Sequence, residues 1–217
     1  MNTITKKIIG LRAMYAPLRV YKLLLHKSSY LHATGWSRSL RERKPVDAAG
    51  KPLPWMNYAV IALLKDRLKK DMRVFEYGCG HSTLFYADRA ESVTAVEYDE
   101  KWLARIKDIA PGNIRLIYQA DDVDGAYCRS IHTTNEQYDV VIVDGRDRVN
   151  CVKQALDALT PNGVLLLDDA QREAYAEALR HAESRGFRPL ALEGLKPTGT
   201  DLERTTLLYR PDNCFNI

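Results

Sequence analysis

The sequence predicts an α/β domain with a doubly wound, mostly parallel sheet of seven strands, preceded by a helical extension. Three observations lead to this expectation. After residue 70, short runs rich in Val, Ile and Leu alternate with segments of helical periodicity. These runs are apolar on both faces, as expected for parallel strands covered by helices on both sides. The last two runs are joined by a segment too short for a crossover helix, which predicts an antiparallel final strand.

Each expected element can be placed along the 217 residues, a length that suits one such domain with an extension. The expected strands are residues 72–77, 93–98, 114–118, 138–144, 163–169, 187–193 and 204–210. The expected helices are residues 3–27 (interrupted near Pro17), 55–70, 81–90, 99–109, 149–159 and 171–185. The segment 28–54 carries Gly, Pro and Ser and predicts a linker or covering loop. We therefore divide the chain into a basic helical arm with its linker, residues 1–54, and a domain, residues 55–217.

Charge is distributed unevenly along the chain. Residues 1–51 contain 11 Lys/Arg and 2 Asp/Glu, a net charge of +9, whereas the remainder carries −5. Such an arm can contact a membrane surface, an acidic substrate or nucleic acid, or it can be a solvated helix face. Because basic residues interrupt every apolar stretch near the N-terminus, we expect neither a signal peptide nor a membrane-spanning helix. At most, the arm lies on a membrane as a basic amphipathic helix.

The four cysteines are scattered and form no C-x-x-C pair. This pattern predicts reduced thiols and neither a disulfide framework nor a zinc site. We therefore expect a cytoplasmic protein, with peripheral contact at the inner membrane surface as the further placement that the basic arm allows. The sequence predicts no particular oligomeric state.

A glycine-rich turn follows the first expected strand, in "VFEYGCGHST", residues 74–83. Gly78 and Gly80 allow a tight turn and the close approach of a ligand. Glu97 ends the second expected strand, 17 residues after Gly80, and the carboxyl ends of neighbouring parallel strands meet at one edge of the sheet. A carboxylate at that place can accept hydrogen bonds from ribose hydroxyls. The pattern predicts a site for the adenosine end of a cofactor.

The residues around this turn favour a positively charged cofactor. A dinucleotide fingerprint would need Gly or Ala at position 83, which is Thr83. Glu76 stands just before the turn, and a carboxylate there repels a pyrophosphate but attracts the ammonium and sulfonium groups of S-adenosyl-L-methionine (SAM).

These motifs resemble those of the class I SAM-dependent methyltransferases, which have a Rossmann-like fold. The resemblance covers residues 72–210 and rests on "EYGCG", "AVEYD" and "VIVDG" in order. Many members have a third glycine where this chain has Ser82, whose hydroxyl can cap the helix instead. The resemblance implies that Asp121 and Asp122 bind the adenine amino group. The expected cofactor-binding residues are Glu76, Tyr77, Gly78, Gly80, Ser82, Thr83, Glu97, Tyr98, Asp121, Asp122 and Asp144.

Three carboxylates are expected to converge at the ends of strands four and five. Asp144 ends the fourth strand, and Asp168 and Asp169 end the fifth. An alcohol acceptor needs a base or a metal ion before it can attack a methyl group. Carboxylates this close either hold a proton between them or bind a cation. We therefore expect Asp144 and Asp169 to be catalytic.

These acids also predict a metal site. The arrangement is similar to the catechol O-methyltransferase group, in which acidic and amide residues hold magnesium, although that group has Asp-Asn where this chain has Asp-Asp. This similarity implies a Mg²⁺ site formed by Asp144, Asp168 and Asp169. The alternative is that Asp168 or Asp169 caps the following helix while Asp144 lines the pocket.

Four residues are candidates for contact with the methyl acceptor. Arg146 and Arg172 could bind a carboxylate or phosphate on the acceptor, or could be helix-surface charges. Trp55 and Tyr58 could form an aromatic wall, or could pack in the core. The loop 195–201 lies at the same edge of the predicted sheet and is a candidate lid.

The leading functional prediction is SAM-dependent O-methylation of a small-molecule or sugar-like acceptor, including a glycan. Nucleic acid is disfavoured as an acceptor because "VDGRD" lacks the Asn/Asp-Pro-Pro-aromatic run of many amino-directed methyltransferases. Two alternatives stay open. One is an N-methyl or aminopropyl transferase of the same fold. The other is a non-catalytic scaffold protein that docks through its basic arm.

Overall fold

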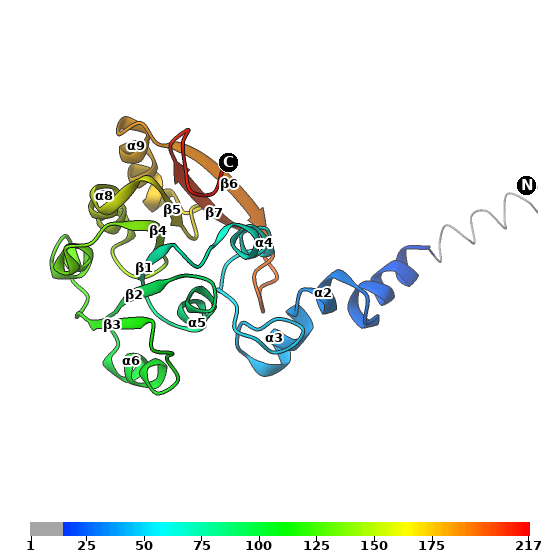
Figure 1. Ribbon diagram of the computed structural model, residues 1–217. Coiled ribbons are helices and arrows are strands. Elements are labelled where there is room, and N and C mark those ends of the chain that lie inside the picture. Colours follow the sequence, from blue (N-terminus) through cyan, green and yellow to red (C-terminus); the bar gives the residue numbers. More distant parts are fainter. Residues whose placement is uncertain (1–14) are drawn as a thin grey trace, which may run out of the picture.

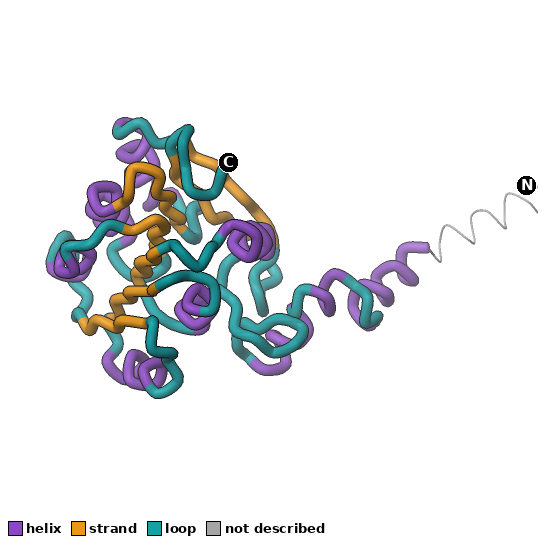
Figure 2. The backbone as a smooth tube through the Cα atoms, viewed as in Figure 1, coloured by secondary structure: helices purple, strands orange, loops and turns teal. Residues whose placement is uncertain are grey.

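The computed structural model describes residues 15–217 as a twisted sheet with helices on both faces and an extension at the N-terminal side (Figure 1, Figure 2). The first predicted helix, residues 3–27, begins outside the described residues. Its described part is helical over residues 15–25.

The sheet contains seven strands in the order β3-β2-β1-β4-β5-β7-β6. Their bounds are β1 Arg73–Tyr77, β2 Ser92–Glu97, β3 Ile114–Tyr118, β4 Tyr138–Val143, β5 Leu159–Leu167, β6 Arg188–Gly194 and β7 Glu203–Tyr209. Strands β1 to β5 pair in parallel, whereas β7 runs antiparallel to both β5 and β6. The predicted fold class is confirmed, including the antiparallel last strand.

Helices cover both faces of the sheet (Figure 1). Their bounds are α2 Tyr30–Ala33, α3 Trp36–Glu42, α4 Tyr58–Arg67, α5 His81–Ala87, α6 Glu100–Lys107, α7 Ala126–Arg129, α8 Arg148–Ala158 and α9 Ala176–Ser184, with 3₁₀ turns η1 Ser130–Thr134 and η2 Glu173–Tyr175. Helices α7, α8 and α9 pack on one face, and α4 and α5 pack on the other.

The alternation of side chains along the strands builds two cores. In β1, Phe75 packs with residues of α7 and α8, including Cys151, whereas Val74 packs on the other face with Leu64 and Phe85. Each of these side chains is at most 1% exposed. Burying one such apolar side chain contributes about 1.5–3 kcal/mol to folding. Because helices cover both faces of the sheet, a ligand is expected to bind at the carboxyl ends of the parallel strands, which we call the carboxyl edge of the sheet.

The connection from β3 to β4 differs from the sequence prediction, which contained no helix there. The chain forms α7 and η1 in this stretch. Both carboxylate oxygens of Asp122 accept hydrogen bonds from backbone N–H groups, of Ala126 at 2.7 Å and of Tyr127 at 3.0 Å. These bonds satisfy donors that the start of a helix leaves free. A four-residue helix is too short to show a helical period in the sequence.

The segment expected as a linker or covering loop contains α2 and α3 and folds over the edge of the sheet. We call residues 29–57 the cover. The Trp36 indole N–H donates to the Gly199 carbonyl at 2.7 Å. Within the cover, the Ser39 hydroxyl donates to the Val46 carbonyl at 2.7 Å and accepts a hydrogen bond from the Val46 N–H at 2.9 Å. The division of the chain at residue 54 stays a prediction of domain organisation.

The helix of residues 15–25, which we call the arm helix, projects away from the sheet (Figure 1). All of its residues are exposed. Within residues 15–217, no helix has both the length and the apolar character that are needed to cross a membrane.

Two loops approach closely where β1 and β4 end. Gly78 has a φ of +97°, a conformation that favours glycine, and its N–H donates to the Val96 carbonyl at 2.8 Å. A Cβ on Gly145 would lie 3.0 Å from both the Gly78 nitrogen and the Tyr77 carbonyl carbon, and it would collide with the Tyr127 hydroxyl. Glycine at position 145 therefore permits the backbone contact that shapes this edge.

We expect Gly145→Ala to lower the free energy of unfolding by about 1–3 kcal/mol, because the added methyl group forces the two loops apart. Urea unfolding followed by circular dichroism measures this change. Gly112→Ala is the matched control, since a Cβ there would meet no atom within 4 Å. Equal stability of the two variants would contradict the close approach.

Candidate functional site

The glycine-rich turn places Glu97 beside the end of β1. The Cys79 N–H donates to Glu97 Oε2 at 3.0 Å, while the N–H groups of Tyr98 and Asp99 each donate to Oε1 at 2.9 Å. Glu97 is 5% exposed. Three charge-assisted bonds thus fix a carboxylate at the end of β2, where the sequence analysis expected a residue that binds ribose.

Glu76 lies beneath the turn and bonds the first turn of α5. It accepts hydrogen bonds from the hydroxyls of Ser82 and, at 2.6 Å, Thr83. Burial raises the pKa of Glu76 to about 7 against the opposing effect of these hydroxyls. The Thr83 hydroxyl also accepts the Gly80 N–H at 2.8 Å, so Thr83 performs the capping that we expected of Ser82.

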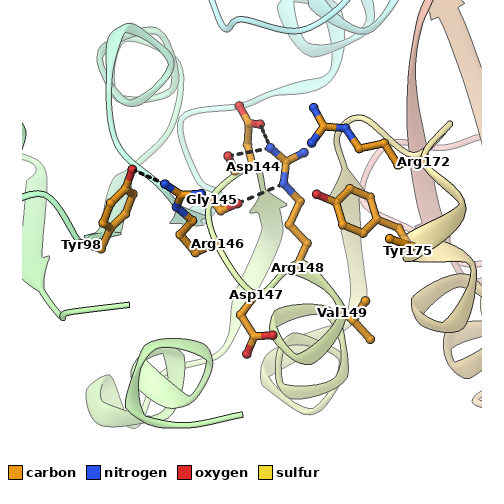
Figure 3. Close-up of a pocket in the computed structure, with 10 residues that line it drawn as sticks. Tyr98, Asp144, Gly145, Arg146, Asp147, Arg148, Val149, Arg172 and Tyr175 are labelled. Carbon is orange, nitrogen blue, oxygen red and sulfur yellow. Dashed lines mark hydrogen bonds and ion pairs between the residues drawn. The ribbon is translucent and has the colours of Figure 1, made fainter. Parts of the chain in front are cut away.

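Tyr98 and Arg146 face each other at the mouth of a cavity of about 480 Å³ (Figure 3). The Arg146 guanidinium lies 4.7 Å from the centre of the Tyr98 ring and donates to its hydroxyl at 3.0 Å. Asp121 is exposed on the loop after β3, whereas the Asp122 carboxylate caps α7. Of the two acids expected near adenine, Asp121 therefore has the freer side chain.

Two predicted site residues lie elsewhere. The Tyr77 side chain is fully buried in the core and its hydroxyl donates to the Cys128 carbonyl at 2.6 Å, so only its backbone reaches the edge. Tyr58 is buried at the start of α4, where its ring meets Tyr30 edge-on. It lines a separate cavity that Trp55 does not share. Of the two residues predicted to form an aromatic wall, Trp55 lies at the edge of the sheet and Tyr58 does not.

Three carboxylates do converge at the ends of β4 and β5, as expected. We call Asp144, Asp168 and Asp169 the acidic edge. Asp168 is completely buried, and its two oxygens accept bonds from the Thr205 hydroxyl at 2.6 Å and from Lys196 Nζ at 2.8 Å.

Lys196 also contacts Asp169 Oδ1, so one ammonium group bridges two neighbouring carboxylates. Burial by itself would lower the pKa of Lys196, but Asp168 and Asp169 raise it. The side chain is therefore a cation at neutral pH and balances the buried negative charge.

Arginines balance the remaining charge. Arg148 Nη2 donates to Asp144 Oδ1 at 2.9 Å (Figure 3). Its Nη1 lies 3.4 Å from Asp169 Oδ2. Arg172 donates to the same Asp169 oxygen at 2.7 Å. Burial works to raise the pKa of Asp169, but Lys196 and the two arginines together lower it.

Asp144 has a different environment from Asp169. Burial, and next the charge of Asp168, raise its pKa well above the ordinary value, although Arg148 and Lys196 oppose this shift. A carboxyl group with a raised pKa can accept a proton near neutral pH, which is what a general base requires.

The acidic edge does not fit the magnesium site that the sequence predicted. The oxygens expected to bind a metal already accept hydrogen bonds from Lys196 and Arg148. Across residues 15–217, no group of three or more His, Cys, Asp and Glu side chains is arranged to hold a metal ion. The cation that the three acids were expected to bind is provided by the chain itself.

Two cavities open at this edge and share Trp55 and Asp144. The first, of about 180 Å³, is lined by Arg43, Lys44, Pro45, Trp55, Cys79, Gly80, His81, Ser82, Trp102 and Asp144. The second, of about 380 Å³, is lined by Trp55, Asp144, Asp169, Arg172, Lys196, Gly199 and Glu203. Trp55 is 49% exposed, so its ring offers an apolar face between the glycine-rich turn and the acidic edge.

Sequence analysis missed two residues of this edge. Lys196 lies in the candidate lid loop, and no spacing in the sequence relates it to Asp168. The Trp102 indole N–H donates to the Cys79 carbonyl at 2.7 Å and so supports the glycine-rich turn from α6. Trp102 lies five residues after Glu97, the acid that ends β2, and this position was a usable signal for it.

Solved structures share this fold at low sequence identity. No protein-family model matches the chain, and no curated protein matches it in sequence. A methyltransferase-like protein from Silicibacter pomeroyi is 21% identical, covering 74% of this chain and 90% of that chain, with a TM-score of 0.54. An rRNA methylase from Streptococcus thermophilus is 20% identical, covering 69% and 92%, with a TM-score of 0.53.

The N-methyltransferase NodS from Bradyrhizobium japonicum, in complex with S-adenosyl-L-homocysteine, is 15% identical, covering 89% of this chain and 97% of that chain, with a TM-score of 0.52. At these identities the likeness establishes the fold. The chain has the fold of the class I SAM-dependent methyltransferases, and the predicted resemblance is confirmed at this level. The similarity to the catechol O-methyltransferase group stays a prediction.

We expect Lys196→Met to lower the free energy of unfolding at pH 7 by about 3 kcal/mol, because it leaves Asp168 buried without its counter-charge. Urea unfolding from pH 7 down to pH 3 measures this change. In the wild type, contacts with positive charges lower the pKa of Asp169 against the effect of burial. They therefore stabilise the fold fully at pH values above the pKa of an aspartate in the unfolded chain, and this stabilisation is lost as the pH falls through the lower pKa of Asp169 in the folded protein. The difference between variant and wild type should therefore shrink in acid.

Lys153→Met is the matched control, since Lys153 pairs with Glu177 on the surface at 2.6 Å. It should unfold like the wild type at every pH. A Lys196→Met protein as stable as this control would show that the lysine does not neutralise the acidic edge.

Proposed function

We propose that this chain is a SAM-dependent methyltransferase that methylates an oxygen atom of a small-molecule or sugar-like acceptor. The observation that carries the proposal is the carboxylate of Glu97, held at the end of β2 by three backbone N–H groups beside the Gly78–Gly80 turn. The fold supports it, because solved structures with the same architecture are methyltransferases.

The charge of the edge supports SAM over a dinucleotide. Glu97 lies beside the turn and the buried Glu76 lies beneath it, whereas Lys196, Arg148 and Arg172 balance the acidic edge along β4 and β5. A pyrophosphate would need bare N–H groups at the start of α5, but the Gly80 N–H is already bonded to Thr83. Negative side chains around a narrow turn suit a sulfonium and an ammonium group.

The cavity beside Trp55 is the proposed acceptor site. It brings one exposed aromatic face together with the carboxylates of Asp144 and Asp169 and with the cation of Arg172. An apolar face with a few convergent polar groups is the usual composition of a small-molecule site. Sugar rings present both an apolar face and hydroxyl groups, so this composition suits them.

In the proposed reaction, Asp144 removes the proton from the acceptor hydroxyl as the oxygen attacks the methyl carbon of SAM. The new bond is C–O, the broken bond is between the methyl carbon and sulfur, and the electron pair of that bond goes to sulfur. Arg148 and Lys196 hold the acidic edge in place and stabilise its charge before the proton arrives. The metal that the sequence predicted has no part in this reaction.

A nucleic-acid acceptor is the second candidate. The observation that favours it is the basic character of residues 1–51, with a net charge of +9. One of the solved structures with this fold is an rRNA methylase, so the fold itself does not disfavour RNA. We rank it second because the cavity beside Trp55 has the composition of a small-molecule site. Assays with both acceptor classes, detecting S-adenosylhomocysteine release, distinguish the two.

We expect Glu97→Ala to weaken SAM binding by about tenfold to a hundredfold, because the ribose loses charge-assisted hydrogen bonds. Isothermal titration calorimetry measures the affinity, and thermal unfolding without ligand shows whether the variant is folded. Glu100→Ala, on the exposed first turn of α6, is the control and should bind SAM as the wild type does. Unchanged affinity in a folded Glu97→Ala protein would refute the ribose assignment.

We expect Asp144→Asn to lower kcat by about 10²–10⁴-fold while SAM affinity changes far less, because the amide cannot accept the proton. Since burial raises the pKa of Asp144, turnover of the wild type should fall in acid at a pH well above the ordinary Asp value. Steady-state kinetics across pH, with and without a metal chelator, measure both effects.

The control for Asp144 is Asp157→Asn, which changes an exposed acid on α8 that pairs with Arg185. It should leave kcat and the pH profile unchanged. Full turnover by Asp144→Asn would eliminate this residue as the base, and loss of wild-type activity in chelator would contradict the metal-free reaction.

A further inference from the structure

The arm helix has many apolar side chains and buries none of them. Its large hydrophobic residues are between 44% and 63% exposed; they are Tyr15, Leu18, Val20, Tyr21, Leu23, Leu24 and Leu25. The following residues 26–28 are also exposed, and burial begins only at Ser29 in the cover. Scattered apolar residues are ordinary on a protein surface, but seven within 11 residues form a contiguous patch.

The arm helix is amphipathic. Arg19 and Lys22 are three residues apart and lie on one side of the helix, with the Arg19 guanidinium 5.0 Å from the centre of the Tyr15 ring. Leu18, Tyr21 and Leu25 follow the same helical spacing on the neighbouring side. A narrow basic stripe therefore borders a wide apolar face.

The charge around the arm helix has one sign. The first 41 residues contain eight Lys/Arg and no Asp or Glu, and the first acid is Glu42. A partner surface for this region must therefore accept apolar side chains and carry negative charge at its rim. The surface of an anionic phospholipid bilayer has both properties.

A second copy of the arm helix fits less well. In a symmetric pair, each basic stripe would meet an identical helix that has no acidic residue to pair with it. The domain cannot cover the arm helix in the described arrangement either, because the helix projects away from it (Figure 1). Within residues 15–217, no helix is long and apolar enough to cross a bilayer, whereas the helical residues 15–25, with two charges among them, are enough to lie along its surface.

We propose that the arm helix is a membrane-docking element that lies along the surface of an anionic phospholipid bilayer. Leu18, Tyr21 and Leu25 enter the boundary between headgroups and acyl chains, where tyrosine rings are favoured. Arg19 and Lys22 contact the phosphate groups. Residues 26–29, which join the arm helix to α2, then tether the domain to the bilayer. This inference is independent of the proposed methyl transfer.

The test is co-sedimentation of the full chain with vesicles of phosphatidylcholine and phosphatidylglycerol, and with vesicles of phosphatidylcholine alone. The wild type should bind the mixed vesicles at least about tenfold more tightly than the neutral ones, and high salt should weaken this binding. Leu18→Ser/Leu25→Ser should reduce binding by about tenfold or more through the lost apolar contact. Arg19→Glu/Lys22→Glu should reduce it at least as much.

The matched control is Lys69→Glu/Lys70→Glu, which reverses two exposed charges on the domain and leaves the arm helix intact. It should keep most of the wild-type affinity for the mixed vesicles. All variants should unfold thermally like the wild type, because the changed side chains are exposed. This comparison separates docking by the arm from general attraction of a basic protein to an anionic surface.

Three results would overturn the proposal. The first is no binding of the wild type to the mixed vesicles. The second is equal loss of binding in the control and in the arm variants. The third is a wild-type protein that does not bind vesicles but forms a dimer in sedimentation velocity, or binds single-stranded RNA, in a way that depends on the arm helix. The apolar face would then have a protein or nucleic-acid partner.

Discussion

Burying negative charge is costly, and this cost governs the carboxyl edge of the sheet. Asp168 has no exposed surface and Asp169 very little, so each needs a cation and hydrogen-bond donors inside the protein. Lys196 and Arg148 supply the cations. Burial, and next the charge of Asp168, raise the pKa of Asp144, whereas the pKa of Asp169 is lowered by Lys196, Arg148 and Arg172 against the effect of burial, so these two neighbouring carboxylates acquire different chemical properties. A difference of this kind between neighbouring acids is how a protein assigns them separate roles.

The same edge is joined to the N-terminal part of the chain by a few directed bonds. The Trp36 indole reaches the Gly199 carbonyl, and the Tyr58 N–H donates to the Leu195 carbonyl at 2.9 Å. Both acceptors lie in the connection between β6 and β7 that also carries Lys196. The cover, the candidate lid and the acidic edge are therefore parts of one bonded unit, and the cavity beside Trp55 lies between them.

Much of this organisation was predictable because it follows from periodicity and strand ends. Apolar runs located all seven strands, and the acids Glu97, Asp144 and Asp169 end up at one edge because parallel strands share their direction. Helix α7 was missed because one capping acid, Asp122, creates it without any period. Lys196 was missed because its partners are 27 and 28 residues away in sequence, and only the antiparallel return of β7 brings them together. The magnesium prediction failed for the same reason, since the sequence shows acids in a row but does not show the cation between them.

The ion pairs that Lys196 forms with Asp168 and Asp169 hold the β6–β7 loop against the end of β5. Lifting the loop would carry its ammonium group away from the Asp168 carboxylate, which forms no other ion pair among the described residues, and would leave that carboxylate buried without a counter-charge. The closed arrangement is thus favoured wherever the carboxyls are ionised, and opening becomes easier only when water or another positively charged group takes the lysine's place. The free energy needed to open the cavity beside Trp55 on this side is therefore set by one ion pair, between Lys196 and Asp168.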